Sequence, residues 1–392
     1  MKRKNIFKRI VKFFLLSCCV CTLCGCSKSD NGTVVLQYAS WGSKSEIDIL
    51  KPILDDFEKL HPDIKIEFMH IPQNYFQKIH LLFASNTPPD VIFMNNLNLP
   101  VYANAGVLEN LSGYGFDTKE FFPQSLDSLT WNGVLYAIPR DVSNLVVFYN
   151  KNIFDDTKVS YPHKDWTFDE FLETARLLTK RPDIFGVSFE EDLLFYLPYL
   201  MSEGGGVLSD DLSASIITGE QSQNGLKFYA DLRKKYHVAP LKSESASATT
   251  AQMFLQGRLG MQISGRWLVP KYREEANFDW DIAPFPKGAA GSVVPLDSSG
   301  WAVAKSSKHK SEAVLLIKYL SSKENIEKMT ESGLIVPARI DAANSKYFLD
   351  DKKPLHAKVF LDVIKTSKPT PVSVNYNEVT DKMKTYTEKL FN

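Results

Sequence analysis

The sequence predicts an α/β fold, and three observations carry this prediction. Patterns typical of strands and helices alternate through residues 33–94, as in a parallel sheet covered by helices. The chain is 392 residues long, which favours two domains over a single hydrophobic core. Its composition is 44% hydrophobic and 23% charged, which is normal for a globular protein and argues against a disordered or fibrous chain.

The first elements form a strand–helix–strand–helix–strand series. Apolar or alternating segments predict strands, and apolar residues at helical spacing predict helices. Strands are expected at 33–39, 64–69 and 90–94, and helices at 45–60 and 75–84. Pro52 lies inside the first helix, where it removes a hydrogen bond and favours a kink.

The middle of the chain predicts a second set of elements. Strands are expected at 132–138 and 145–149, around a loop at 139–141, and at 259–263. A capping-box signature at 167–170 begins a helix, and further helices are expected at 222–236 and 249–256. Prolines and glycines predict a loop near 284–300. The last hundred residues favour helices, at 311–320, 323–331, 356–364 and 378–390.

The N-terminus has the pattern of an export signal. Residues 1–12 are basic, and 13–23 form an apolar run too short to cross about 30 Å of hydrocarbon. The following Leu23-Cys24-Gly25-Cys26 resembles the lipobox of bacterial lipoproteins, although Cys24 departs from the usual Ala, Ser or Thr. We expect a signal peptide at 1–25, lipidation of Cys26 and a polar tether at 26–32. An ordinary secretory signal is the alternative.

Charge and cysteines separate this leader from the body of the protein. All five cysteines lie before residue 27, at positions 18, 19, 21, 24 and 26. The body after residue 25 holds 40 basic and 46 acidic residues, a net charge of −6. It therefore has no second thiol for an internal disulfide and no strongly basic character for nucleic-acid binding. Its charge gives no long-range attraction for a multiply anionic ligand, which favours a neutral one.

Local motifs of common enzyme classes are missing from the sequence. It contains no G-x-S-x-G, no H-E-x-x-H, no phosphate loop and no G-x-G-x-x-G after the first strand. The seven histidines lack metal-ligand spacing, so we expect neither a metal nor a cofactor. Glycoside hydrolysis needs only two carboxylates that folding brings together, so a carbohydrate-active enzyme stays open as an alternative.

Short segments in a fixed order resemble family 1 of the extracellular solute-binding proteins of ABC transporters, the maltose-binding-protein-like family. The resemblance is clear over residues 33–340 and looser in the tail; no single segment is specific, but their order is. After the lipobox, it is carried by Trp41-Gly42, residues 57–66, 89–92, 105–108, 135–139, 148–151, 254–260, 264–267 and 313–321.

This resemblance implies a two-lobed, periplasmic-binding-protein type II fold, with discontinuous lobes and a ligand cleft between them. It places one lobe at 33–142 plus 297–339 and the other at 143–296 plus 340–392. It implies a monomer on the extracytoplasmic face of a bacterial membrane that binds a carbohydrate and delivers it to an ABC permease without catalysis.

Three alternatives stay open. The first is a surface-anchored glycoside hydrolase or lyase, the second a binding protein for glycerol phosphate or a polyamine, and the third an adhesin or structural lipoprotein without a small ligand.

A sugar presents apolar faces and a ring of hydroxyl groups, so its site needs aromatic side chains with amide or charged groups. In parallel sheets these groups follow the carboxyl ends of strands. We expect Trp41 after the first strand, Asn95 and Asn96 after the third, and Arg140 with Asp141 near the first crossover to contact the ligand. An Arg–Asp pair within the protein is the alternative role of the last two.

Four further candidates lie at later strand and helix ends. Trp267 follows a predicted strand, where the family places a stacking aromatic. Glu203 precedes a triple glycine, Trp301 follows the predicted loop, and Tyr376 precedes the last helix. A helix-end charge is the alternative role of Glu203, and a buried strand aromatic that of Trp301.

Overall fold

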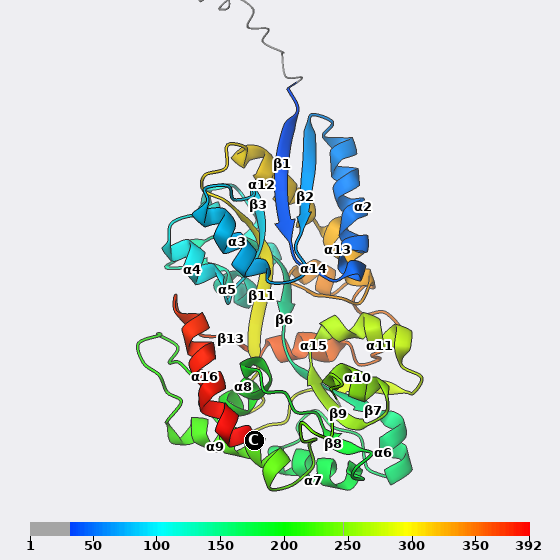
Figure 1. Ribbon diagram of the computed structural model, residues 1–392. Coiled ribbons are helices and arrows are strands. Elements are labelled where there is room, and N and C mark those ends of the chain that lie inside the picture. Colours follow the sequence, from blue (N-terminus) through cyan, green and yellow to red (C-terminus); the bar gives the residue numbers. More distant parts are fainter. Residues whose placement is uncertain (1–31, 246) are drawn as a thin grey trace, which may run out of the picture.

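The computed structural model describes residues 32–245 and 247–392, which form two α/β lobes (Figure 1). The predicted signal peptide, Cys26 and all but the last residue of the predicted tether lie outside the described residues. One sheet has the strand order β12-β6-β11-β3-β1-β2, with β13 paired to β11, and the other has the order β10-β7-β9-β8. We call the parts built on these sheets the N-terminal and the C-terminal lobe. The predicted two-lobed α/β fold is confirmed.

The N-terminal lobe begins with the predicted alternation. Its first elements are β1 (Val34–Ser40), α2 (Lys44–Leu60), β2 (Ile64–His70), α3 (Tyr75–Ala84) and β3 (Val91–Asn95). The three strands are parallel neighbours, with β1 between β2 and β3. A capping box of Ser43 and Glu46 begins α2, which runs through Pro52 as one helix. Its apolar face, including Ile53 and Phe57, is buried, and this burial stabilises the helix enough to offset the hydrogen bond lost at the proline.

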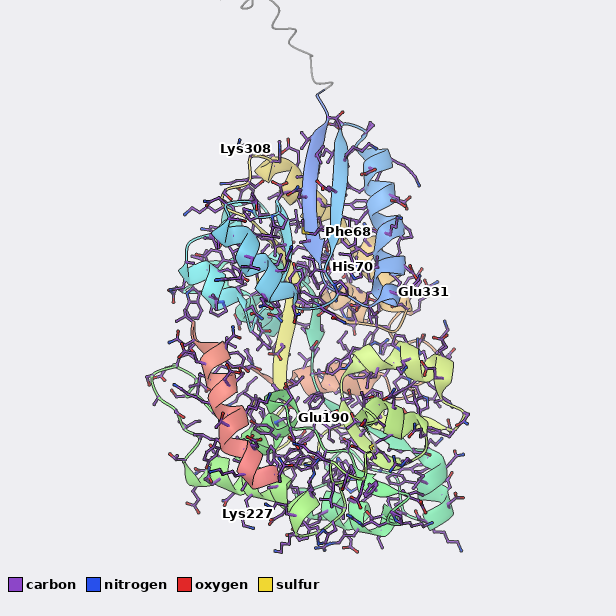
Figure 2. All side chains as sticks on the ribbon, viewed as in Figure 1. Phe68, His70, Glu190, Lys227, Lys308 and Glu331 are labelled. Carbon is purple, nitrogen blue, oxygen red and sulfur yellow. The ribbon has the colours of Figure 1, made fainter. Side chains whose placement is uncertain are left out.

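Side chains fill the interior of both lobes around these sheets (Figure 2). The rest of the N-terminal lobe comprises α4 (Leu99–Asn104), α5 (Pro123–Ser128), β4 (Thr130–Trp131), β5 (Val134–Leu135), α12 (Lys310–Leu320), α13 (Lys323–Glu331), β12 (Val336–Pro337) and α14 (Ile340–Ala343). The C-terminal lobe comprises β7 (Val146–Asn150), α6 (Lys151–Thr157), α7 (Phe168–Leu178), β8 (Phe185–Val187), α8 (Leu193–Ser202), α9 (Glu220–Lys234), α10 (Thr250–Leu255), β9 (Leu259–Ser264), α11 (Val269–Glu275), β10 (Trp280–Ala283), α15 (Lys358–Ile364) and α16 (Tyr376–Phe391).

Two antiparallel strands, β6 (Ala137–Ser143) and β11 (Pro295–Val303), carry the chain between the lobes at the centre of Figure 1. The predicted loop at 139–141 is wrong, because these residues belong to β6, in which Pro139 and Asp141 pair with β11. The loop predicted near 284–300 is also too long, because β11 begins at Pro295. Pro139 has no N–H for the ladder, and the register shifts between Ser299 and Gly300, opposite it.

The third crossing between the lobes follows α14. This helix packs on α13 and β12, which both belong to the N-terminal lobe. We therefore place the end of the N-terminal lobe after Ala343, one short helix later than the predicted boundary at residue 339. From there the chain continues to α15 and to β13 (Lys368–Pro369), which pairs with the start of β11.

Trp301 is a core residue of the N-terminal lobe. Its side chain is 0% exposed, and its indole Nε1 donates a hydrogen bond to the Tyr38 hydroxyl at 2.9 Å. The ring lies 6.0 Å from that of Phe93. Because β11 is a central strand, Trp301 points into the core between sheet and helices. We therefore correct the prediction that Trp301 contacts a ligand; its role is that of a buried strand aromatic.

A double-mutant cycle tests this buried hydrogen bond. Trp301→Phe removes the donor to a hydroxyl whose pKa burial raises to about 12, and we expect a loss of about 1–3 kcal/mol in the free energy of unfolding. Adding Tyr38→Phe removes the acceptor as well, so the double variant should lose less than the sum of the single ones. Urea denaturation followed by circular dichroism measures each loss, and strictly additive losses would contradict the assigned bond.

Candidate functional site

A cavity of about 220 Å³ lies between the lobes, and both contribute side chains to it. Trp41 comes from the N-terminal lobe and Trp267 from the C-terminal lobe. The fold thus brings together two predicted ligand residues that are separated by more than two hundred positions. The remaining lining residues are Glu46, Arg140, Asp141, Val142, Ser143, Arg266, Ser299, Leu334, Ile335 and Val336.

Trp41 directly follows β1 at the carboxyl edge of the parallel strands. Its half-buried ring packs against aromatic side chains, with ring centroids 4.3 Å from Phe93 and 5.1 Å from Tyr75. His70, at the end of β2 (Figure 2), contacts the Gly42 carbonyl oxygen through Nε2 at 2.9 Å. These contacts fix the indole at the cavity wall before any ligand arrives.

Trp267 lies in a short 3-10 helix (Arg266–Leu268) that follows β9, and its side chain is 36% exposed. The indole folds back over Gly265, where a Cβ would lie 1.9 Å from the ring. Glycine is therefore required at position 265 if Trp267 is to keep this place.

Arg140 and Asp141 form the ion pair within the protein that was their alternative role. Arg140 Nε donates to Asp141 Oδ2 at 2.5 Å, its Nη2 lies 3.8 Å from Glu46, and its guanidinium stacks over Phe93 at 4.3 Å. Burial raises the pKa of Asp141, and the charge of Arg140 opposes that rise. One cation shared by two carboxylates leaves an excess of negative charge on this wall.

Arg266 is an unpaired cation in the C-terminal lobe. It is 2% exposed, and none of its three guanidinium nitrogens has a hydrogen-bond partner among the described residues. The guanidinium stacks over Phe348 at 4.1 Å and lies 5.6 Å from the ring of Phe360. Burial lowers the pKa of Arg266 to about 9. The sequence offered no signal for this residue, because its burial is set by the tail of the chain.

A second cavity between the lobes, of about 570 Å³, includes Tyr376 at the start of α16. Its polar lining includes Asn98 of the N-terminal lobe, Asp192 of the C-terminal lobe and Asp297 of β11. Asp297 pairs across the strands with Ser143, which lines the smaller cavity, so the two cavities lie next to each other along β6 and β11.

Asn95 and Asn96 lie at the carboxyl end of β3, where both bind other parts of the protein. Asn96 is 3% exposed, donates to Asp297 at 2.9 Å and accepts from the Ser298 N–H at 3.1 Å, so it links β3 to β11. Asn95 Oδ1 accepts from the backbone and the side chain of Asn98, as a turn former does. Neither lines the two cavities, whereas Asn98, which the sequence reasoning missed, lines the larger one.

Glu203 lies at the C-terminal end of α8 and lines neither cavity. Its Oε1 lies beside Gly288, where a Cβ would be 2.7 Å away. Its position at the end of α8 agrees with its alternative role as a helix-end charge. Across the described chain, no group of three or more His, Cys, Asp or Glu side chains is arranged to hold a metal ion. No helix in this part of the chain is long and apolar enough to cross a membrane.

Gly265→Ala tests the position of Trp267 without touching its side chain. The added methyl group would displace the indole, and we expect stronger quenching of tryptophan fluorescence by acrylamide. Gly113→Ala is the matched control, because a Cβ there meets nothing within 4 Å. Equal quenching of both variants would contradict the packing of Trp267 on Gly265.

Comparison with known proteins agrees with this architecture. Residues 43–327 match the family model described as bacterial extracellular solute-binding protein. The chain is 23% identical over 350 residues to the galactooligosaccharide-binding protein of Bacillus subtilis, covering 86% of this chain and 80% of that protein.

Two solved structures share the fold over most of their length. An ABC substrate-binding protein of Listeria monocytogenes in complex with cycloalternan has a TM-score of 0.85 and 24% identity, covering 92% of this chain and 94% of that one. Maltose-bound MalE3 of T. maritima has a TM-score of 0.78 and 25% identity, covering 92% and 95%. With a family model that spans most of the sequence and a two-lobed fold that agrees with it, the chain belongs to the bacterial extracellular solute-binding proteins.

Proposed function

We propose that the protein binds a neutral carbohydrate between its lobes and delivers it to the permease of an ABC transporter. One observation carries this proposal: Trp41 and Trp267, one from each lobe, line a single cavity together with a carboxylate–guanidinium cluster. Indole rings match the apolar faces of a sugar, and the charged groups can exchange hydrogen bonds with its hydroxyls. The names of the relatives, which refer to galactooligosaccharide, cycloalternan and maltose, support a saccharide.

The charges of the cavity favour a neutral ligand over glycerol phosphate. Arg140 is already neutralised by Asp141 and Glu46, so it has no free charge to offer a phosphate. Arg266 also lines this cavity, but all three of its guanidinium nitrogens are buried. A polyamine would need several free carboxylates beside the aromatics, and the two acids of this wall already share a cation.

Ligand binding would signal to the permease by closing the lobes. A ligand that contacts both walls stabilises the conformation in which they are close together, and this population shift is what a permease could recognise. No catalytic group is needed for this cycle.

A thermal-shift screen over maltose, maltotriose, galactooligosaccharides and cycloalternan tests the proposal. At a free concentration of about 100 times the Kd, a ligand bound between the lobes should add about 2.7 kcal/mol to the free energy of unfolding and raise the Tm. Trp267→Ala should abolish the shift with little change in the unliganded Tm, whereas Trp131→Ala, in the β4–β5 hairpin, should retain it, because Trp131 lines neither cavity between the lobes.

Two results would overturn this function. One is a shift that survives Trp267→Ala unchanged. The other is conversion of a bound oligosaccharide into smaller products, seen by chromatography of the recovered ligand, because this would indicate the glycoside hydrolase or lyase.

We also propose that the mature protein is anchored to the extracytoplasmic face of the membrane through lipidated Cys26. The lipobox-like Leu23-Cys24-Gly25-Cys26 supports this anchor, as does the extracellular description of the family. Cells fed an alkyne-labelled fatty acid should label the wild type and Cys24→Ser, but not Cys26→Ser. Label retained on Cys26→Ser would refute the anchor.

A further inference from the structure

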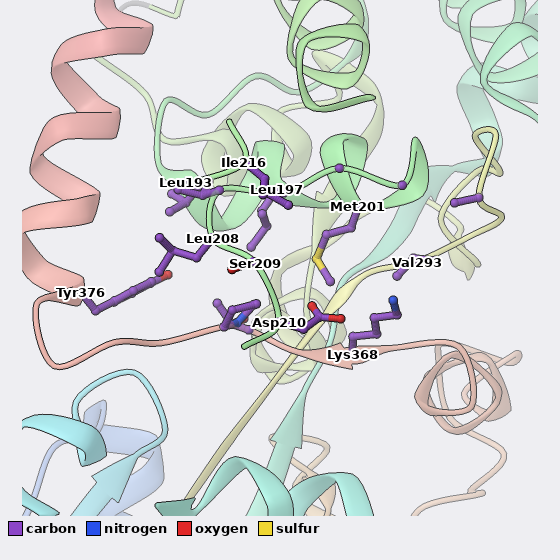
Figure 3. A pocket seen from close by; sticks show the side chains of 17 residues that line it. Leu193, Leu197, Met201, Leu208, Ser209, Asp210, Ile216, Val293, Lys368 and Tyr376 are labelled. Atoms are coloured by element: carbon purple, nitrogen blue, oxygen red, sulfur yellow. The ribbon is translucent and has the colours of Figure 1, made fainter. Parts of the chain in front are cut away.

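A third cavity, of about 350 Å³, has an aliphatic lining that differs from the two cavities described above (Figure 3). Leu193, Leu197 and Met201 project into it from α8, and Leu208 and Val293 come from loops of the C-terminal lobe (Figure 3). Ser209, Asp210 and Lys368 are among its polar side chains. Among the described residues, Tyr376 is the only aromatic one that lines this cavity.

This aliphatic pocket continues from the larger cavity between the lobes. The two spaces share four lining residues, Leu193, Leu197, Thr370 and Tyr376. Beyond these shared residues, the lining of the larger cavity is mostly polar and includes Asn98, Asp192, Asp297 and further charged side chains. A ligand lying across both spaces would therefore meet polar groups at one end and hydrocarbon at the other.

Hydrogen bonds donated by backbone N–H groups hold the wall of the pocket in place. The Gly205 N–H donates to the Leu200 carbonyl at 2.9 Å, and the Gly206 N–H donates to Ser222 Oγ at 2.9 Å. A Cβ on Gly205 would lie 2.4 Å from the Ser222 nitrogen, so the loop is packed tightly onto α9. The pocket is thus preformed, as small-molecule sites usually are.

A sugar ring is a poor occupant of this pocket. Its hydroxyl groups would lose water and find few partners on leucine, methionine and valine side chains, which is unfavourable. A hydrocarbon group loses nothing of this kind and gains apolar contact. A cavity of about 150 Å³ with similar lining is already large enough for benzene, so an aryl or short alkyl group has room here.

We propose that the ligand is a glycoside with an apolar aglycone. The saccharide lies between the lobes, from the cavity of Trp41 and Trp267 into the larger cavity beside it, and an aryl or alkyl aglycone enters the aliphatic pocket beside Tyr376. This inference rests on the proposed carbohydrate binding and names the class of carbohydrate. The competing outcome is that closure of the lobes fills the pocket with protein, for which Leu97 of the N-terminal lobe, in the lining of the adjoining cavity, is the apolar candidate.

Calorimetry with matched pairs of ligands tests the aglycone site. The probes are methyl and phenyl α-glucoside, and methyl and phenyl β-galactoside. With the wild-type protein we expect the phenyl member of the bound pair to bind at least tenfold more tightly than the methyl member. Equal affinities would overturn the proposal, because the pocket would then contribute nothing.

Two pocket variants and one control make the test specific. Leu208→Ser removes apolar lining at a partly exposed position, and Ala290→Phe fills the pocket from its exposed rim. Both should bring the phenyl affinity down to the methyl affinity and leave the methyl affinity unchanged. Leu177→Ser, at an exposed position of α7 that does not line the pocket, should keep the full difference. A difference that persists in both pocket variants would place the aglycone elsewhere.

Failure of sugar binding would be distinguishable from failure of this inference. If none of the four glycosides binds, N-phenyl-1-naphthylamine serves as a sugar-free apolar probe. Enhanced fluorescence that Leu208→Ser removes and Leu177→Ser retains would support the apolar pocket although the saccharide proposal fails. No enhancement with any of the proteins would overturn the pocket itself.

Discussion

The antiparallel pairing of β6 with β11 is the contact on which both lobes depend, because these strands are central to the larger sheet and also lead into the smaller one. At Gly300 a Cβ would lie 2.1 Å from the Ile138 carbonyl oxygen, so the strands approach more closely than any other residue would permit. The register shift beside it accommodates Pro139, which cannot donate to the ladder. A ladder of this kind resists separation of the lobes, while its few connecting residues still allow them to bend.

The same strands set the chemistry of the space between the lobes. Arg140 and Asp141 lie on β6, so their ion pair is fixed to the sheet and not to a mobile loop. Trp41 and Trp267 each stand at the end of a strand of their own lobe, and both reach one cavity. The character of the lining then changes along β11, from the indoles to the acids near Asp297 and on to the aliphatic pocket beside Tyr376. Such a gradient suits a ligand whose two ends differ in polarity.

Local patterns predicted the elements whose burial follows a regular period. The helix expected at 75–84 is found as Tyr75–Ala84, because its apolar spacing is complete within the segment. The segments 139–141 and 295–300 were predicted to be loops but belong to β6 and β11. Their proline, glycine and serine residues indicate loops unless a strand far along the chain pairs with them. The same long-range pairing buries Trp301 and ties Asn96 to Asp297, which no local pattern reveals. Strand ends did indicate Trp41 and Trp267, whereas the aliphatic pocket combines residues from five separate stretches of the chain.

The distance between the lobes with and without ligand tests the central claim most directly. The sequence has no cysteine after Cys26, so Cys26→Ser with Glu331→Cys in α13 and Glu274→Cys in α11 would carry one spin label on each lobe; Glu331 is marked in Figure 2. Electron–electron double resonance should show a shorter, narrower distance distribution once a saccharide that raises the Tm is added. An unchanged distribution while that saccharide is demonstrably bound would contradict closure of the lobes around it.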